Sequence, residues 1–177
     1  YRKFWPGYLL KLFTKNRFSY GFDDFSAKVS IDFSRKDKLM ISFYAGNDLL
    51  INNETSSKDE ESYGQSRVNW SNTLGAVKYT RVLSEKLFAD LTTYYTQYKY
   101  ITNNDAYYYE EDSTFSHYYT HYSSFVRDIS AKLSFSYLPL NNLQIKFGGQ
   151  YINHRYLPGA STFSSTGSVV YSDTANF

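Results

Sequence analysis

Phe25-Ser26-Ala27-Lys28-Val29-Ser30-Ile31-Asp32-Phe33-Ser34 alternates apolar and polar side chains without interruption. In a β-strand, a period of two places the apolar side chains on one face of the sheet and the polar side chains on the other. The stretch therefore predicts a strand with one face against an apolar medium. The alternation by itself fits a soluble sheet as well as a membrane barrel.

Six alternating strands are predicted along the chain. They cover about residues 20–34, 39–47, 68–83, 87–100, 125–137 and 143–156. Three short turns join them in pairs, and the intervening segments 48–67, 101–124 and 157–177 are predicted to be long loops. Short turns at one end and long loops at the other are typical of outer-membrane barrels. We therefore expect an all-β fold, a transmembrane antiparallel up-and-down β-barrel in the bacterial outer membrane.

The composition is compatible with such a barrel. The chain of 177 residues has no cysteine, a net charge of +2 and a mean hydropathy of -0.53. No apolar run approaches the roughly 20 residues that a membrane-spanning helix needs. Barrel strands expose only alternate residues to lipid, so a barrel can be polar on average. Lysines and arginines are scattered along the chain, which gives no indication of a nucleic-acid partner.

Six strands are too few to close a barrel. Single-chain bacterial barrels start at about 8 strands, and an open edge in lipid would leave backbone groups unsatisfied. The first residues, Tyr1–Phe13, do not resemble a targeting peptide, because they lack a small-residue cleavage site. We therefore expect the chain to be an internal part of a larger barrel.

Five stretches resemble barrel segments of TonB-dependent receptors of the Bacteroidota type. They are Tyr20–Lys28, Phe43–Asp48, Trp70–Tyr79, Val126–Lys132 and Phe147–Gly159. The resemblance implies a 22-stranded barrel, a plug domain and import of a scarce nutrient with energy relayed by TonB. The plug domain and the TonB box are not among these residues. The resemblance also implies outer-membrane lipid as surroundings. A surface lipoprotein that lids the barrel, as in the glycan and peptide importers of this group, is a candidate partner that the sequence leaves open.

The tyrosine-rich segment 101–124 is the most distinctive candidate for contacts. Tyrosine rings are rigid and amphipathic, and they lose little conformational entropy on binding. Trp70 joins this set, although a place in the aromatic girdle at the membrane boundary is the expectation we favour for it. The candidate contact residues for a ligand or partner are Tyr107, Tyr108, Tyr109, His117, Tyr118, Tyr119, His121 and Trp70.

The alternation also assigns residues to the two sides of the barrel wall. The predicted lipid-facing residues are Phe25, Ala27, Val29, Ile31, Ile129, Ala131, Leu133 and Phe135. The predicted lumen-facing residues are Lys28, Asp32, Asp128 and Lys132. Polar groups in a lumen must find partners, so we expect the two lysines to pair with the two aspartates or with the plug.

No catalytic residue, cofactor or metal is predicted. His117 and His121 are four residues apart, but they lack the glutamate of a zinc-protease helix. The acidic runs Asp59–Glu61 and Glu110–Asp112 have no spaced ligand pattern and read as solvated loops. No serine lies in a nucleophile elbow. An enzyme is therefore not expected.

Two alternatives to the importer remain open. One is a passive porin, or a scaffold barrel in a surface or secretion complex. The other is a soluble glycan-binding β-sandwich, in which two sheets would bury their apolar faces against each other. The sequence does not identify the substrate, because loops that determine specificity diverge freely on one fold.

Overall fold

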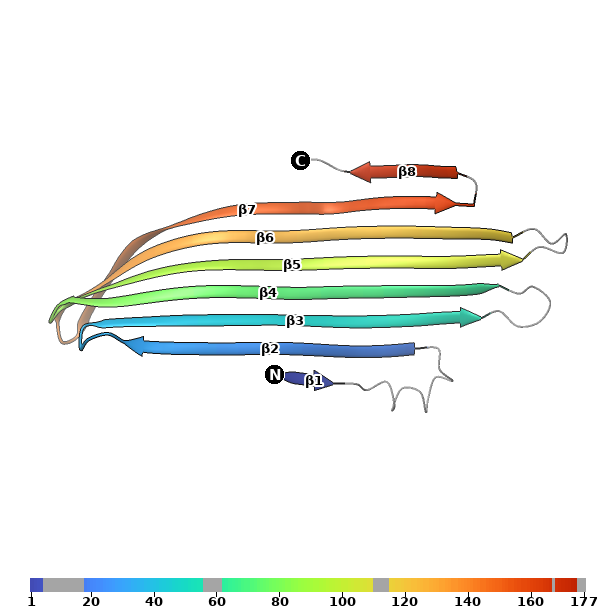
Figure 1. Ribbon diagram of the computed structural model, residues 1–177. Helices are drawn as coiled ribbons and strands as arrows, with labels where there is room; N and C mark the ends of the chain where they lie inside the picture. Colours follow the sequence, from blue (N-terminus) through green and yellow to red (C-terminus); the bar gives the residue numbers. More distant parts are fainter. Residues whose placement is uncertain (5–17, 56–61, 110–114, 167, 175–177) are drawn as a thin grey trace.

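The computed structural model describes residues 1–4, 18–55, 62–109, 115–166 and 168–174. These residues form one antiparallel sheet whose strands follow each other in chain order (Figure 1). The strands are β1 (Arg2–Phe4), β2 (Phe18–Asp32), β3 (Asp37–Thr55), β4 (Tyr63–Ser84), β5 (Leu87–Tyr109), β6 (Phe115–Leu140), β7 (Leu143–Ser165) and β8 (Ser168–Thr174). The prediction of an all-β, antiparallel, up-and-down fold is confirmed. The sheet is open, and no helix among the described residues could span a membrane.

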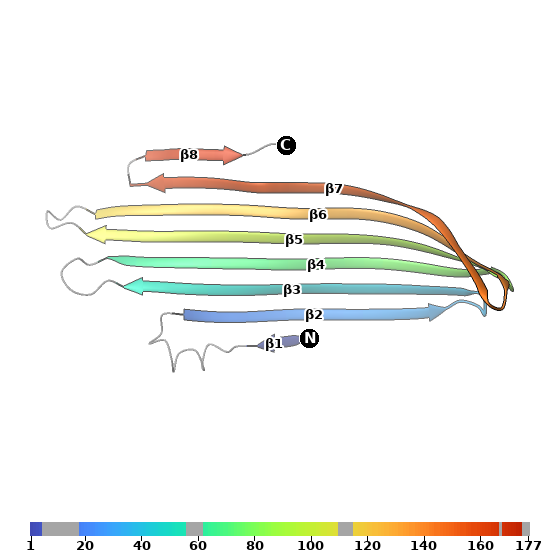
Figure 2. The same cartoon turned by 180° about the vertical axis from the view of Figure 1, so that it is seen from behind.

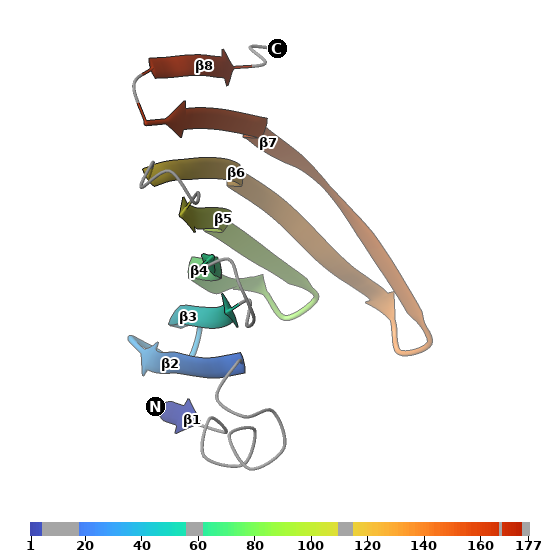
Figure 3. The same ribbon diagram turned by 90° about the vertical axis from the view of Figure 1, so that its right-hand side faces the viewer.

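The sheet is a single layer (Figures 2 and 3). No apolar side chain is buried in the part of the chain that the structure describes. The two buried residues there are polar, Asp24 at 8% exposure and Ser130 at 2%. A sandwich would have required a buried layer of apolar side chains between two sheets. The fold is therefore held by its hydrogen-bonded ladder, and its apolar side chains lie uncovered.

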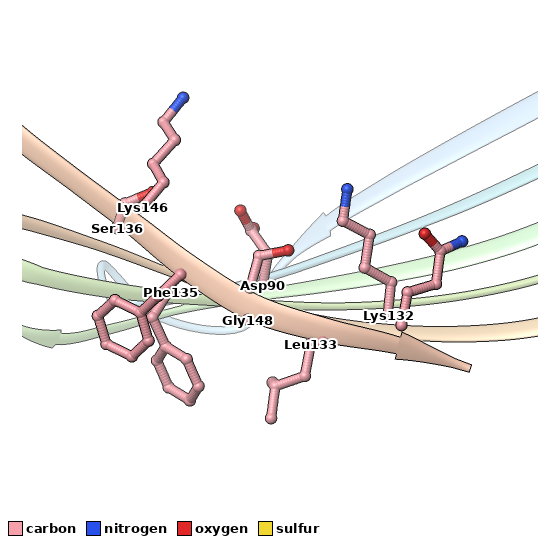
Figure 4. A pocket seen from close by; sticks show the side chains of 11 residues that line it. Asp90, Lys132, Leu133, Phe135, Ser136, Lys146 and Gly148 are labelled. Atoms are coloured by element: carbon pink, nitrogen blue, oxygen red, sulfur yellow. The ribbon is translucent and has the colours of Figure 1, made fainter.

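The strand pairing divides the side chains between two faces. Cross-strand partners share a face, so the register assigns each residue to one of them. The apolar face carries all eight residues predicted to face lipid, and the polar face carries all four predicted to face the lumen. Figure 4 shows this division on β6, where Leu133 and Phe135 point away from Lys132.

The strands β3 to β7 are longer than the alternation predicted, whereas β2 has the predicted length of 15 residues. β2 to β7 correspond to the six predicted strands, and β1 and β8 add one short strand at each edge. Most of residues 48–67, 101–124 and 157–177 lies in strands, so the prediction of long loops there is wrong for the described part. Beyond the apolar band, apolar and polar residues no longer alternate regularly, as in Leu49-Leu50-Ile51 of β3. The hydropathy alternation therefore disappears while the ladder continues, supported by the high strand propensity of tyrosine and threonine.

The three short turns lie together at one end of the sheet (Figure 1). They connect β2 to β3, β4 to β5 and β6 to β7. Neighbouring hairpins are joined there, since the Val82 amide donates to the Lys36 carbonyl and the Leu138 amide to the Lys86 carbonyl, each at 2.8 Å. The Lys86 ammonium also donates to the Pro139 carbonyl at 2.9 Å. These bonds fix the relative heights of the three turns.

The apolar residues form a band that crosses the strands at an angle. On β2 the band covers residues 25–31, with its midpoint at Lys28, and on β7 it covers residues 145–151, with its midpoint at Gly148. The register places Lys28 level with Ile152, which is four residues from Gly148 (152 − 148 = 4). A strand rises about 3.3 Å per residue, and neighbouring strands lie about 4.8 Å apart. An offset of four residues over five strand steps therefore inclines the band by about 30° to the hydrogen-bonding direction of the sheet.

Candidate functional site

The predicted contact residues are divided between the two faces of the sheet. Trp70, Tyr108 and Tyr118 lie on the polar face. Tyr107, His117, Tyr119 and His121 lie on the apolar face, farther from the turns than the apolar band. The backbone of Tyr109 pairs with Phe115, and its side chain is outside the described residues. The structure therefore separates one sequence cluster into two sites.

On the polar face, aromatic rings from four strands form a row. The Tyr20 ring stacks on Trp70 with 6.3 Å between centroids and 24° between planes. Trp70 is the cross-strand partner of Tyr100, and Tyr100 meets Tyr122 edge to face at 6.1 Å. We call Tyr20, Trp70, Tyr100 and Tyr122 the aromatic row. All four side chains are half-buried, so each ring keeps an accessible part.

A carboxylate lies beside the aromatic row. The Tyr20 hydroxyl donates a 2.5 Å hydrogen bond to Asp48 Oδ1 on β3. This hydrogen bond, aided by partial burial, raises the pKa of Tyr20. The row thus offers flat apolar surfaces next to an anionic hydrogen-bond acceptor. Such a combination can hold a ligand with both apolar faces and polar donors, since aromatic side chains supply contact area at low entropic cost.

More aromatic residues continue the polar face toward the loop ends. Tyr108 and Tyr118 pack edge to face with 5.8 Å between centroids. Tyr118 also lies 6.2 Å from Phe163 on β7. These rings extend the aromatic surface of the polar face away from the short turns.

On the apolar face, the histidine cluster is internally satisfied. Tyr107 and His117 stack at 4.4 Å with planes inclined by 6°, and His117 Nε2 lies 3.2 Å from Asp105 Oδ1. His121 Nδ1 lies 2.6 Å from Asn103 Oδ1, which also accepts a 3.1 Å hydrogen bond from the Tyr119 hydroxyl. Within the described ranges, no group of three potential metal ligands is found. The cluster acts mainly to tie β5 to β6 beyond the band.

One prediction about the polar face is wrong, and one alternative of another is not found. Trp70 lies on the polar face, whereas a place in an aromatic girdle requires the apolar face, so the favoured prediction for this residue is wrong. Lys28 and Lys132 were expected to pair with the two aspartates or with the plug, and among the described residues the two aspartates have other partners. Asp32 pairs with Lys38 at 3.5 Å and Asp128 with His154 at 2.8 Å. Lys38 and His154 are the direct cross-strand partners of the two aspartates. Direct cross-strand partners lie closer together than two residues four positions apart on one strand, as the predicted lysines are.

Lys132 instead borders an open hollow over β5, β6 and β7. Asp90, Lys132, Lys146 and Gln150 line its polar side (Figure 4). Asp90 is paired with Lys78 at 3.2 Å and accepts a hydrogen bond from Thr80. Neither Lys28 nor Lys132 has an ion pair with any residue that the structure describes. Both lysines therefore present unneutralised charge on the polar face.

No protein-family model and no curated protein matches this chain. The resemblance to TonB-dependent receptors in the five stretches stays a prediction. Function must therefore be argued from the arrangement of the faces and of the aromatic row.

Sequence reasoning missed Tyr20, Tyr100 and the carboxylate of Asp48, and it included Tyr122 only as part of the tyrosine-rich segment. Tyr20, Tyr100 and Tyr122 fell at predicted strand ends or in a predicted loop, and Asp48 was placed at the start of another loop. A hairpin register, counted outward from each short turn, would have placed these residues on the face of Trp70. The sequence pattern did not reveal that the strands continue, because apolar and polar residues no longer alternate regularly beyond the apolar band.

Proposed function

We propose that this chain is part of the β-barrel of a TonB-dependent outer-membrane receptor that imports a scarce nutrient. The observation that carries the proposal is the uncovered apolar band on one face of a single-layer sheet. Val29 is 54% exposed, Ile129 57% and Phe147 55%. Large apolar side chains at such exposure, gathered in one band, indicate a surface that another apolar phase covers.

The dimensions and slope of the band support lipid as that phase. A tilted transmembrane strand crosses the hydrocarbon in about 9–11 residues, whereas the strands β2 to β7 have 15 to 26 residues. The excess projects beyond the membrane on the side opposite the turns, which are periplasmic in this arrangement. The inclination of about 30° between the band and the ladder approaches the tilt of about 35–45° in outer-membrane barrels.

In this proposal the polar face lines the lumen. The aromatic row and Asp48 contact the nutrient as it enters, and the unpaired Lys28 and Lys132 contact the plug domain. Energy for release comes from TonB through a region outside these residues, and a surface lipoprotein is a further partner. No covalent chemistry is involved, because the proposed transport consists of binding and displacement.

Membrane fractionation followed by mass analysis tests the proposal. The native protein containing these residues is extracted from outer membranes, and its intact mass and peptide map are recorded. We expect detergent-dependent extraction and a chain several times heavier than 20.7 kDa with plug-domain peptides. A water-soluble protein, or a membrane chain without a plug, would contradict the importer.

The passive porin is the second candidate, because the polar face alone would also suit an open channel. Liposomes that contain the purified protein separate the two. A plugged receptor should give no swelling in small sugars, whereas a porin should give swelling that depends on sugar size. The soluble sandwich has no support from the single-layer sheet.

A further inference from the structure

Three cations lie on the apolar face just beyond the apolar band. Arg127 is the next residue on this face after Ile129, the last apolar residue of the band on β6. Arg155 on β7 is its direct cross-strand partner. Lys99 on β5 lies diagonally across, since its own partner is Phe125. We call Arg127, Arg155 and Lys99 the cation cluster.

The cation cluster has no internal counter-charge. Like charges directly opposite each other on a sheet are destabilising, and Arg127 and Arg155 occupy such a pair. None of the three cations forms an ion pair with a described residue. Their neighbours on this face are uncharged, namely Gln97, Phe125 and Asn153. Asp128 lies on the opposite face and is paired with His154.

Arg127 in particular lacks an acceptor. Its Nε is buried and has no hydrogen-bond partner among the described residues. Its guanidinium carbon lies 5.6 Å from the centre of the Phe125 ring, a cation–π contact that positions the group without neutralising it. The arrangement therefore holds an arginine in place and leaves its charge available.

We propose that the cation cluster binds the phosphate of a phosphorylated lipid headgroup in the outer leaflet. This inference rests on the proposed barrel, because it requires the apolar face to contact lipid. Arg127 lies two residues beyond Ile129, about 7 Å along the strand. The headgroup layer on each side of a bilayer is about 5–7 Å thick, so the guanidinium reaches the depth of the phosphates. Arginine matches phosphate with two parallel hydrogen bonds.

The adjoining surface favours a lipid over a soluble anion. Tyr151, 69% exposed, lies on the same face of β7 as Arg155 and nearer to the turns. A tyrosine at that level suits the boundary between acyl chains and headgroups. The phosphate of a lipid can bind the cation cluster, while its acyl chains contact the Tyr151 ring and the apolar band. A free phosphate ion would use only the cations.

Lipid titration of the full-length receptor tests the inference. Detergent-solubilised protein is titrated with diphosphoryl lipid A and with its dephosphorylated form, and binding is followed by native mass spectrometry. At about 1 kcal/mol for each cation, the variant R127Q/R155Q should bind the diphosphoryl lipid roughly thirtyfold more weakly than the unaltered protein. The control R35Q/K36Q removes two cations from the 33–36 turn, at the opposite end of the sheet, and should bind as the unaltered protein does.

The outcomes separate this inference from the proposed function. Equal lipid binding by R127Q/R155Q, equal loss in the control, or full competition by millimolar inorganic phosphate would overturn the headgroup site. Each of these results would leave the barrel intact if both variants still assemble in outer membranes. A protein that does not enter membranes at all would overturn the barrel and the headgroup site together.

Discussion

The Tyr20 hydroxyl donates a hydrogen bond to Asp48 across β2 and β3, while its ring stacks on Trp70. The carboxylate favours the protonated phenol and raises the pKa of Tyr20 above the ordinary value of 10.0. A group whose pKa is higher in the folded state than in the unfolded state stabilises the fold, and its full contribution is present at pH values below the unfolded pKa. We therefore expect this contribution to be lost as the pH rises from about 10 through the folded pKa of Tyr20.

Urea unfolding between pH 8 and 12 measures this loss. The unaltered protein should lose more stability over that range than Tyr20→Phe, which lacks the titrating hydroxyl. Tyr98→Phe on the same face is the matched control and should keep the full alkaline dependence. Identical profiles for the unaltered protein and Tyr20→Phe would show that the hydrogen bond to Asp48 contributes nothing.

A charge at the middle of the apolar band should prevent stable insertion. Val29→Lys places an ammonium near the membrane midplane, at a cost of about 2–4 kcal/mol in a barrel. The next residue, Ser30, lies on the polar face, so Ser30→Lys should cost far less. Folding free energies in phospholipid vesicles give the comparison, and Leu133→Lys with Ser134→Lys repeats it on β6. Equal costs on both faces would rule out a lipid-facing band.

Adjacent glycines on β7 should respond differently to a methyl group. A Cβ at Gly148 would overlap the Leu133 carbonyl oxygen and lie 2.9 Å from Ser134 Cα. A Cβ at Gly149 would meet nothing within 4 Å. Gly148→Ala should therefore destabilise the β6–β7 pairing by about 1–3 kcal/mol, the usual range for overpacking. Gly149→Ala should leave the urea midpoint almost unchanged, and the reverse order would contradict this close approach.

Acid should weaken the turn end of the sheet. Asp37 opens β3 next to the 33–36 turn, outside the apolar band, and hydrogen bonds from Tyr79 and then Ser34 lower its pKa. A lowered pKa stabilises the fold above the unfolded value, and this contribution is lost as the pH falls through the folded pKa. Urea midpoints below pH 4 should therefore fall less in Asp37→Asn than in the unaltered protein. A larger fall in the variant would refute this assignment.

The faces of the strands could be predicted from the sequence, whereas the contacts across them could not. Phe25 and Lys28 reveal their faces through alternation with their immediate neighbours. The partner of Asp128 is His154, from the next strand, and nothing near either residue in the sequence indicates the pair. The full length of β5 could not be predicted either. Its outer part includes polar residues such as Asn103 and Asp105 on the apolar face, so apolar and polar residues do not alternate there.

The sequence by itself determined the alternating faces, the short turns and the antiparallel pairing within each of the three hairpins. These features follow from local periodicity and from connections too short for any other arrangement. Only the tertiary structure decided which residues lie level with each other. It brought Tyr20 to Trp70 and Arg127 to Arg155, and it gave the apolar band its slope. The reason is physical: cross-strand neighbours are set by the register of whole hairpins, and register depends on pairing along the full strands.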